Sequence, residues 1–215
     1  MNTNAVPIAF AHSALRDHRH VCAFFNSAEQ EYDILLPFIC DGLNCGQRAF
    51  HVLPQRHRDD HLQRLRNVGI DVDAVQKSRQ LEIALPQDTY LRTGRFNKED
   101  MLALIQKSLR DGHSLGFPLT RMIAHAETAV EDWKSGNEWV EYEMRLNEVL
   151  PNYDDPVICT YDVNLLNSNL AIDILRTHPV AVIGGVLVEN NFFTTPEDFL
   201  REVRERTSPH RPYRG

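Results

Sequence analysis

A short apolar run, an amphipathic helix pattern and a second apolar run constrain the fold of this chain more than any other feature. The segment Val21–Phe25 has the uninterrupted apolar character of a strand buried on both faces of a parallel sheet. Ser27 and Gln30 fit a capping box at the start of a helix that stops near Gly42. The segment Gln47–Leu53 then indicates a second strand. This β-α-β order predicts an α/β domain.

The turn between the first strand and this helix lacks the residues that bind a polyphosphate. A phosphate loop uses glycines, so that backbone N–H groups converge on the anion, and a lysine that meets the terminal phosphates. The turn from Asn26 to Gln30 holds a carboxylate and neither a glycine nor a lysine. We therefore do not expect polyphosphate binding at this turn.

Strand and helix patterns continue to alternate along the rest of the chain. Further strands are predicted at Leu81–Leu85, Leu119–His125 and Val157–Tyr161, and further helices at Asp59–Val68, Asn97–Gly112, Glu138–Leu150, Ser168–Thr177 and Pro196–Arg204. Two short strands around Gly184 and Gly185 suggest a hairpin. The pattern predicts a three-layer α/β sandwich with a mostly parallel central sheet, helices on both faces and a C-terminal β-hairpin.

Length and composition limit the organisation and the partners of the protein. A chain of 215 residues suffices for one well-buried core. We expect a single domain over 18–204, a flexible N-terminal arm over 1–17 and a flexible tail over 205–215. The formal net charge of −7 argues against direct nucleic-acid binding. No apolar run reaches membrane-spanning length and no signal sequence is evident, so a cytoplasmic protein is expected.

An ordered set of short motifs resembles the MEDS family, the DcmR-type sensory domains named for methanogen and methylotroph regulators. The matching segments are His20–Phe25, Pro37–Gly46, Thr89–Phe96, Arg121, Glu141–Asn147, Ile158–Asp162 and His178-Pro179. The resemblance implies a ligand-sensing module for small organic, hydrocarbon-derived molecules, usually joined to a DNA-binding or histidine-kinase domain.

The order of segments also resembles a degenerate RecA- or KaiC-type core. ATPases of that type place a catalytic glutamate directly after the second strand and a metal-binding acid at the end of the fourth. This chain has Pro54-Gln55 and Ala124-His125 at those positions. Because the phosphate lysine is also missing, the resemblance implies a RecA-like fold without ATPase activity.

Ligands of parallel α/β sheets bind beyond the C-terminal ends of the strands. This rule selects six candidate ligand-binding residues: Phe25, Asn26, Ser27, His125, Tyr161 and Asp162. The Tyr161 hydroxyl and the Asp162 carboxylate could orient a polar ligand group. Alternatively, they are a strand-end aromatic and a capping or turn aspartate.

Two further candidates, Arg121 and Glu143, complete the predicted site. Glu143 falls within the apolar stripe of its helix, so its carboxylate must be paired, hydrogen-bonded or protonated. Arg121 in the fourth strand is the expected partner. The pair is either a structural ion pair at the seam between helix and sheet or a ligand-orienting pair.

No metal ligand, cofactor or catalytic residue is predicted from the histidines and cysteines. His57 and His61 share a helix face at a zinc-like spacing, but Arg58 and the lack of a glutamate favour a solvated helix start. His20 and His178 are expected only to mark a strand end and a helix end. The four cysteines show no CxxC spacing and are expected to be reduced.

The leading hypothesis is a non-catalytic sensory domain that binds a small organic ligand. It would modulate a separate signalling protein, such as a histidine kinase or a transcription regulator, through a population shift. The alternatives are a protein–protein docking module without a ligand and a nucleotide binder without hydrolysis. The possibility of a homodimer is left open.

Overall fold

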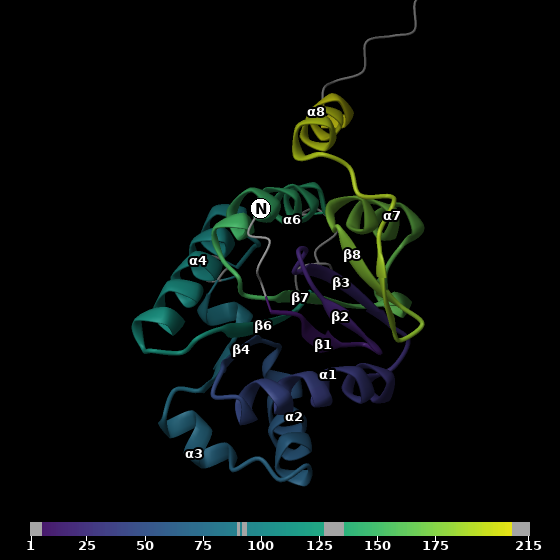
Figure 1. Cartoon of the computed structure of the whole chain (residues 1–215). Coiled ribbons are helices and arrows are strands. Elements are labelled where there is room, and N and C mark those ends of the chain that lie inside the picture. The colour runs from purple at the N-terminus through teal and green to yellow at the C-terminus, as the bar shows by residue number, and fades with distance from the viewer. Residues whose placement is uncertain (1–5, 90, 92–93, 127–135, 208–215) are drawn as a thin grey trace, which may run out of the picture.

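A seven-stranded sheet forms the middle layer of the protein (Figure 1). The computed structural model describes residues 6–89, 91, 94–126 and 136–207. In the described part, the strand order is β5-β4-β6-β7-β3-β8-β9 and every neighbouring pair is parallel except β8 and β9. The strands are β3 (His20–Phe25), β4 (Arg48–Val52), β5 (Leu81–Ala84), β6 (Thr120–His125), β7 (Val157–Asp162), β8 (Val180–Ile183) and β9 (Val186–Glu189). The mostly parallel sheet and the C-terminal hairpin are confirmed.

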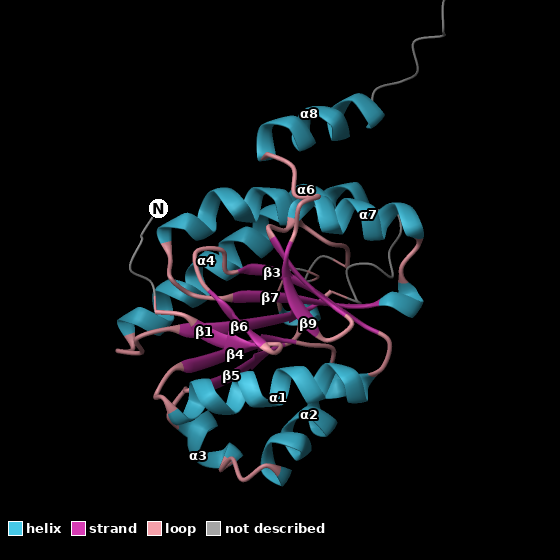
Figure 2. Ribbon diagram, turned by 45° about the vertical axis from the view of Figure 1, so that its right-hand side comes forward, coloured by secondary structure: helices cyan, strands magenta, loops and turns pink. Residues whose placement is uncertain are grey.

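Helices cover both faces of this sheet (Figure 2). One face carries α1 (Ala28–Asn44), α2 (Gln55–Asn67) and α3 (Val72–Lys77). The other carries α4 (Lys98–Ser114), α6 (Gly136–Val149) and α7 (Ser168–Thr177), with α8 (Pro196–Thr207) in contact with α6 and α7. The sequence pattern did not predict α3, and α2 begins four residues before the expected Asp59. Within the described residues, no helix has the length and apolar character of a membrane span.

Alternation of side chains along the strands divides the core into two parts. In β3, Val21, Ala23 and Phe25 belong to the cluster that contacts α1, while Cys22 belongs to the cluster that contains the α6 side chains. We call these two sides of the sheet the α1 face and the α6 face. The place of a residue along a strand therefore decides which of the two layers of helices its side chain faces.

Most of the expected N-terminal arm is an ordered part of the fold. Strands β1 (Ile8–Phe10) and β2 (Ser13–Leu15) pair antiparallel. Phe10 and Leu15 are buried, and the Phe10 ring lies 4.8 Å from the Phe38 ring of α1, measured between centroids. The expectation of a flexible arm is wrong for the described part of this segment, because alternate apolar residues in a short hairpin cover α1. Residues 1–5, and 208–215 of the expected tail, lie outside the described residues.

Replacing Phe10 by Ala should therefore destabilise the whole domain. We expect the free energy of unfolding to fall by about 3–5 kcal/mol, the usual cost of truncating a buried phenylalanine. Urea denaturation measures this change. The matched control is Val6→Ala, since Val6 is 77% exposed and its truncation should change stability by less than about 0.5 kcal/mol. Equal and negligible effects of both substitutions would show that the hairpin is not part of the cooperative fold.

Candidate functional site

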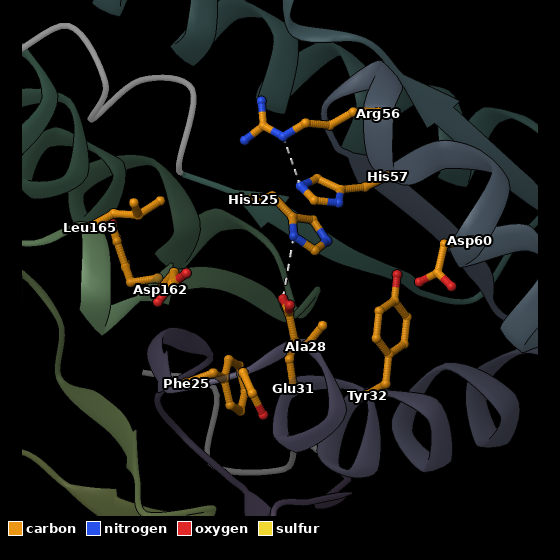
Figure 3. A pocket seen from close by; sticks show the side chains of 12 residues that line it. Phe25, Ala28, Glu31, Tyr32, Arg56, His57, Asp60, His125, Asp162 and Leu165 are labelled. Carbon is orange, nitrogen blue, oxygen red and sulfur yellow. Dashed lines mark hydrogen bonds and ion pairs between the residues drawn. The ribbon is translucent and has the colours of Figure 1, made fainter.

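A cavity of about 260 Å³ lies where several parallel strands end at their C-terminal edge (Figure 3). Five of the predicted ligand-binding residues line it: Phe25, Ser27, His125, Tyr161 and Asp162. The remaining lining residues come from the first two turns of α1 and α2 and from the turn after β7, and they are Ala28, Glu31, Tyr32, Arg56, His57, Asp60 and Leu165. The strand-end rule thus located the cavity, while a binding role for these residues stays a prediction.

An ion pair between His125 and Glu31 forms part of the cavity wall. Nδ1 of His125, the last residue of β6, lies 3.3 Å from Oε1 of Glu31 (Figure 3). Both residues are mostly buried, so water screens this contact little. Sequence reasoning missed Glu31. The available signal was helical spacing, because Ala28, Glu31 and Tyr32 lie three and four residues apart on one face of α1.

The polar groups of Tyr161 and Asp162 already have protein partners. The Tyr161 hydroxyl donates to Oε1 of Glu143 at 2.6 Å and accepts from Nε1 of Trp139 at 3.1 Å. Burial, with the nearby Glu143 carboxylate, raises the pKa of Tyr161 well above its usual value. Asp162 accepts the N–H of Asn164 at 2.9 Å and caps the short 3-10 turn that follows. The capping alternative for Asp162 is confirmed, although the residue also lines the cavity.

Hydrogen bonds within the chain stabilise the turn after β3. The Ser27 hydroxyl accepts the N–H of Gln30 at 3.3 Å and caps α1. The Gln30 side chain in turn accepts the N–H of Asn26 at 2.8 Å, and Asn164 donates to the Asn26 carbonyl at 3.0 Å. Asn26 is exposed and is not among the residues that line the cavity.

Arg121 lies far from the cavity and does not pair with Glu143. It is the second residue of β6, so about 13 Å of strand separates it from His125 at the C-terminal end. Its guanidinium contacts Asp41 at 2.6 Å and donates from Nε to Gln47 at 2.6 Å, both on the α1 face. The predicted pairing is wrong because Glu143 belongs to α6, on the other side of the sheet.

Glu143 is instead the centre of a buried polar cluster. The residue is fully buried, and its Oε2 lies 3.2 Å from Nε2 of His20 and 3.4 Å from Nε2 of His178. The Cys159 thiol donates to the same oxygen at 3.6 Å. Burial raises the pKa of Glu143, but the adjacent His178 and His20, when protonated, outweigh this effect and hold the pKa below its usual value. His20 and His178 therefore do more than mark element ends.

A second buried chain of polar groups starts at the cavity and runs beneath α2. The Tyr32 hydroxyl lies 2.9 Å from Nδ1 of His61, whose Nε2 lies 2.9 Å from Nδ1 of His51. His61 is only 1% exposed, so the expectation of a solvated side chain is wrong for His61, whereas Asp59 and Asp60 are exposed. The early start of α2 at Gln55 places His61 well inside the helix, where it faces the sheet. Burial, with the nearby His125, lowers the pKa of His61 to about 3.

This buried histidine should make stability depend on pH. An unfolded histidine binds a proton near pH 6.5, whereas folded His61 stays neutral down to about pH 3, so stability decreases as pH falls through this range. His61 alone should lower the free energy of unfolding by about 2 kcal/mol between pH 7 and pH 5. Urea denaturation of His61→Asn at both pH values should show a smaller loss than the unaltered protein.

The matched control for this experiment is His18→Asn, because His18 is exposed. The control should keep the full pH dependence. Since His61→Asn also removes buried hydrogen bonds, the decisive quantity is the change between the two pH values and not the stability at either one. An unchanged difference in His61→Asn would contradict the inward, neutral placement of this ring.

The layered sheet and its edge cavity define a RecA-like α/β domain. A KaiC-like protein of the archaeon Pyrococcus horikoshii shares this fold with a TM-score of 0.54 and 14% identity, over 76% of this chain and 69% of that chain. The sequence model of MEDS, the MEthanogen/methylotroph, DcmR Sensory domain, matches residues 19–179, and the chain belongs to this family. The predicted resemblance is thereby confirmed.

A transcriptional repressor, DcmR of Methylorubrum extorquens, is 28% identical to this chain over 178 residues. The aligned region covers 81% of this chain and 63% of the repressor. The chain thus spans less than two thirds of the length of this relative. Together with the family match, this similarity supports a sensory or regulatory role.

Proposed function

We propose that this domain is a non-catalytic sensor that binds a small organic molecule in the cavity at the C-terminal edge of its sheet. Ligand binding would alter the activity of a separate signalling protein, such as a transcription regulator or a histidine kinase. The observation that carries the proposal is the cavity itself, which lies at the sheet edge where this class of fold binds ligands and contains five of the residues selected from the sequence.

The size and lining of the cavity favour a small, partly polar ligand. Its volume of about 260 Å³ falls below the range of roughly 300–1,000 Å³ that is usual for drug-sized ligands. Phe25 and Leu165 offer apolar contacts, while His125, Glu31 and Asp162 place polar groups nearby. A compact organic molecule with one polar group fits this combination.

The charge at the start of α1 disfavours a nucleotide as the ligand. A helix N-terminus attracts anions through its free N–H groups and its dipole. In α1 the first turn carries Glu29 and Glu31, and Ser27 occupies the capping position. These carboxylates would repel a phosphate at the position where a RecA-like nucleotide site requires one.

A docking role is the second candidate function, and it can accompany ligand sensing. The β8–β9 hairpin and the segment after it expose several large apolar side chains, which are Ile183, Val186, Val188 and Phe192. Phe192 is 72% exposed. Such side chains favour a surface that contacts another protein, as a sensor requires in order to transmit its signal.

Thermal-shift measurements with a panel of small molecules test the sensor proposal. The panel contains short-chain alcohols, aldehydes, carboxylates, amines and halogenated alkanes, together with ATP. We expect at least one organic compound to stabilise the protein saturably, by about 5–10 °C when its concentration exceeds the dissociation constant about 100-fold. ATP should give no saturable shift. Native mass spectrometry of the freshly purified protein would reveal a ligand that copurifies.

A matched pair of substitutions links any stabilisation to the cavity. Ala28 is exposed in the first turn of α1 and lines the cavity, so Ala28→Phe should fill it and abolish the shift. Ala74 is exposed in the first turn of α3 and does not line the cavity, so Ala74→Phe should keep the shift. Retention of the shift by both variants would place the ligand elsewhere, and saturable stabilisation by ATP would favour the nucleotide alternative.

A further inference from the structure

Four potential metal ligands converge in the core on the α6 face of the sheet. They are His20 in β3, Glu143 in α6, Cys159 in β7 and His178 between α7 and β8. One ligand atom of each residue lies within 4.8 Å of those of the other three. All four side chains are buried, and three of them are completely inaccessible to solvent. Exposed clusters of polar residues are common, but a cluster buried to this degree requires a physical reason.

Hydrogen bonds fix both imidazoles so that Nε2 faces the centre of the cluster. Nδ1 of His178 lies 2.8 Å from the carbonyl oxygen of Ile174, to which it must donate. Nδ1 of His20 lies 3.0 Å from Oδ1 of Asn147. The amide nitrogen of Asn147 donates to the Thr177 carbonyl at 2.7 Å, which leaves Oδ1 as the acceptor for His20. In the neutral tautomers set by these contacts, each Nε2 carries a lone pair.

When both rings are neutral, their Nε2 lone pairs and the lone pairs of the Glu143 oxygen face one another, and the Cys159 thiol is the donor that reaches this oxygen. Nε2 of His20 and Nε2 of His178 both point at Oε2 of Glu143, which is itself an acceptor. Nε2 of His178 is fully buried and has no hydrogen-bond partner among the described residues. In metal sites, a histidine that binds the ion through one ring nitrogen usually donates the N–H of the other to an oxygen, and this hydrogen bond orients the imidazole. A cation at the centre would satisfy all of these lone pairs.

The distances fit a tetrahedral ion of the size of zinc. Zn–N and Zn–O bonds of about 2.0–2.2 Å and Zn–S bonds of about 2.3 Å imply ligand atoms separated by roughly 3.3–3.8 Å. Around Oε2 of Glu143 the measured separations are 3.2 Å to His20, 3.4 Å to His178 and 3.6 Å to the sulfur of Cys159. The sulfur lies 3.9 Å from Nε2 of His20. The remaining two separations, from His178 to His20 and to Cys159, are within 4.8 Å, so side-chain adjustments of about 1 Å would close the tetrahedron.

Charge and ligand type also favour a transition-metal dication. A carboxylate and a thiolate together neutralise a divalent ion, so the occupied site would bury no net charge. Imidazole and thiolate ligands select zinc-like ions, whereas Mg²⁺ and Ca²⁺ prefer oxygen ligands only. Binding deprotonates Cys159: the S–H bond breaks, a metal–sulfur bond forms and the proton passes to solvent. Cys22, on the same face, donates instead to the Val180 carbonyl at 3.8 Å and serves as an internal comparison.

We propose that His20, Glu143, Cys159 and His178 form a closed site for a divalent transition-metal ion of the zinc class. Four protein ligands leave no open position, so the role of the ion is structural. It would join two central strands, helix α6 and the segment between α7 and β8. Because Glu143 also accepts the hydroxyl of the cavity residue Tyr161, the ion would stiffen one wall of the cavity. This proposal does not depend on the identity of the organic ligand.

Metal uptake by the unaltered protein tests the proposal directly. The protein is stripped with a chelator under mildly denaturing conditions, refolded and titrated with Zn²⁺ or Co²⁺. We expect one equivalent to bind after dialysis, as measured by elemental mass spectrometry, with a rise in melting temperature. Bound Co²⁺ should show a thiolate-to-metal charge-transfer band and the visible absorption of a tetrahedral site. Failure to bind a stoichiometric amount of either ion would overturn the proposal, whatever any variant does.

Two cysteine variants locate the ion. Cys159→Ser should abolish the charge-transfer band and weaken Co²⁺ binding at least about tenfold. Cys22→Ser changes an equally buried thiol that lies outside the cluster, so it should keep both the band and the affinity. A band that persists in Cys159→Ser would place the ion at another cysteine and refute the assignment. If Cys159→Ser does not fold, loss of the band on Cys22→Ser, or failure of the unaltered protein to bind the ion, would refute it.

Discussion

The α6 side of the structure depends on the contacts that the buried carboxylate of Glu143 makes. An isolated charge in the core would cost several kcal/mol, so the surrounding elements must supply partners for it. His20 supplies a contact from β3, Tyr161 from β7 and His178 from the segment between α7 and β8. One carboxylate thereby ties helix α6 to the sheet through contacts that tolerate little displacement. Polar contacts as well as apolar packing therefore fix the position of α6 against the sheet.

The two faces of the sheet have different chemistry, and one residue connects them. On the α1 face, His125 and Glu31 line the cavity, whereas the α6 face carries the buried cluster around Glu143. Tyr161 lines the cavity and donates its hydroxyl to Glu143. A ligand that displaced the Tyr161 ring would therefore strain a hydrogen bond of 2.6 Å within the core. This contact offers a physical route from the cavity to the packing of α6, which is what a sensory domain requires.

Local sequence patterns predicted the elements of the fold better than their contacts. The strands and the mostly parallel sheet followed from apolar runs and capping residues such as Ser27 and Asn97, which both cap helices in the structure. The N-terminal hairpin was missed because its alternation covers only a few residues. The partner of Glu143 was misassigned because spacing within one element carries no information about which residues of other elements it meets, and these lie between 16 and 123 positions away. Alternation along β6 puts Arg121 and His125 on the same face, and the structure shows that both contact α1 whereas Glu143 lies in α6.

The RecA-like fold of this chain combines a turn after β3 that lacks glycine and lysine with a cavity at the strand ends. The geometry of parallel strands still opens a cavity at their C-terminal edge, because helices must diverge there to enter and leave the sheet. The first turn of α1, which would otherwise attract an anion, carries Glu31, and this carboxylate pairs with His125 at the end of β6. The positive end of the helix dipole is therefore compensated by a carboxylate of the chain itself. Under the function proposed above, this cavity would admit a small molecule recognised by shape and a few polar contacts rather than a phosphate.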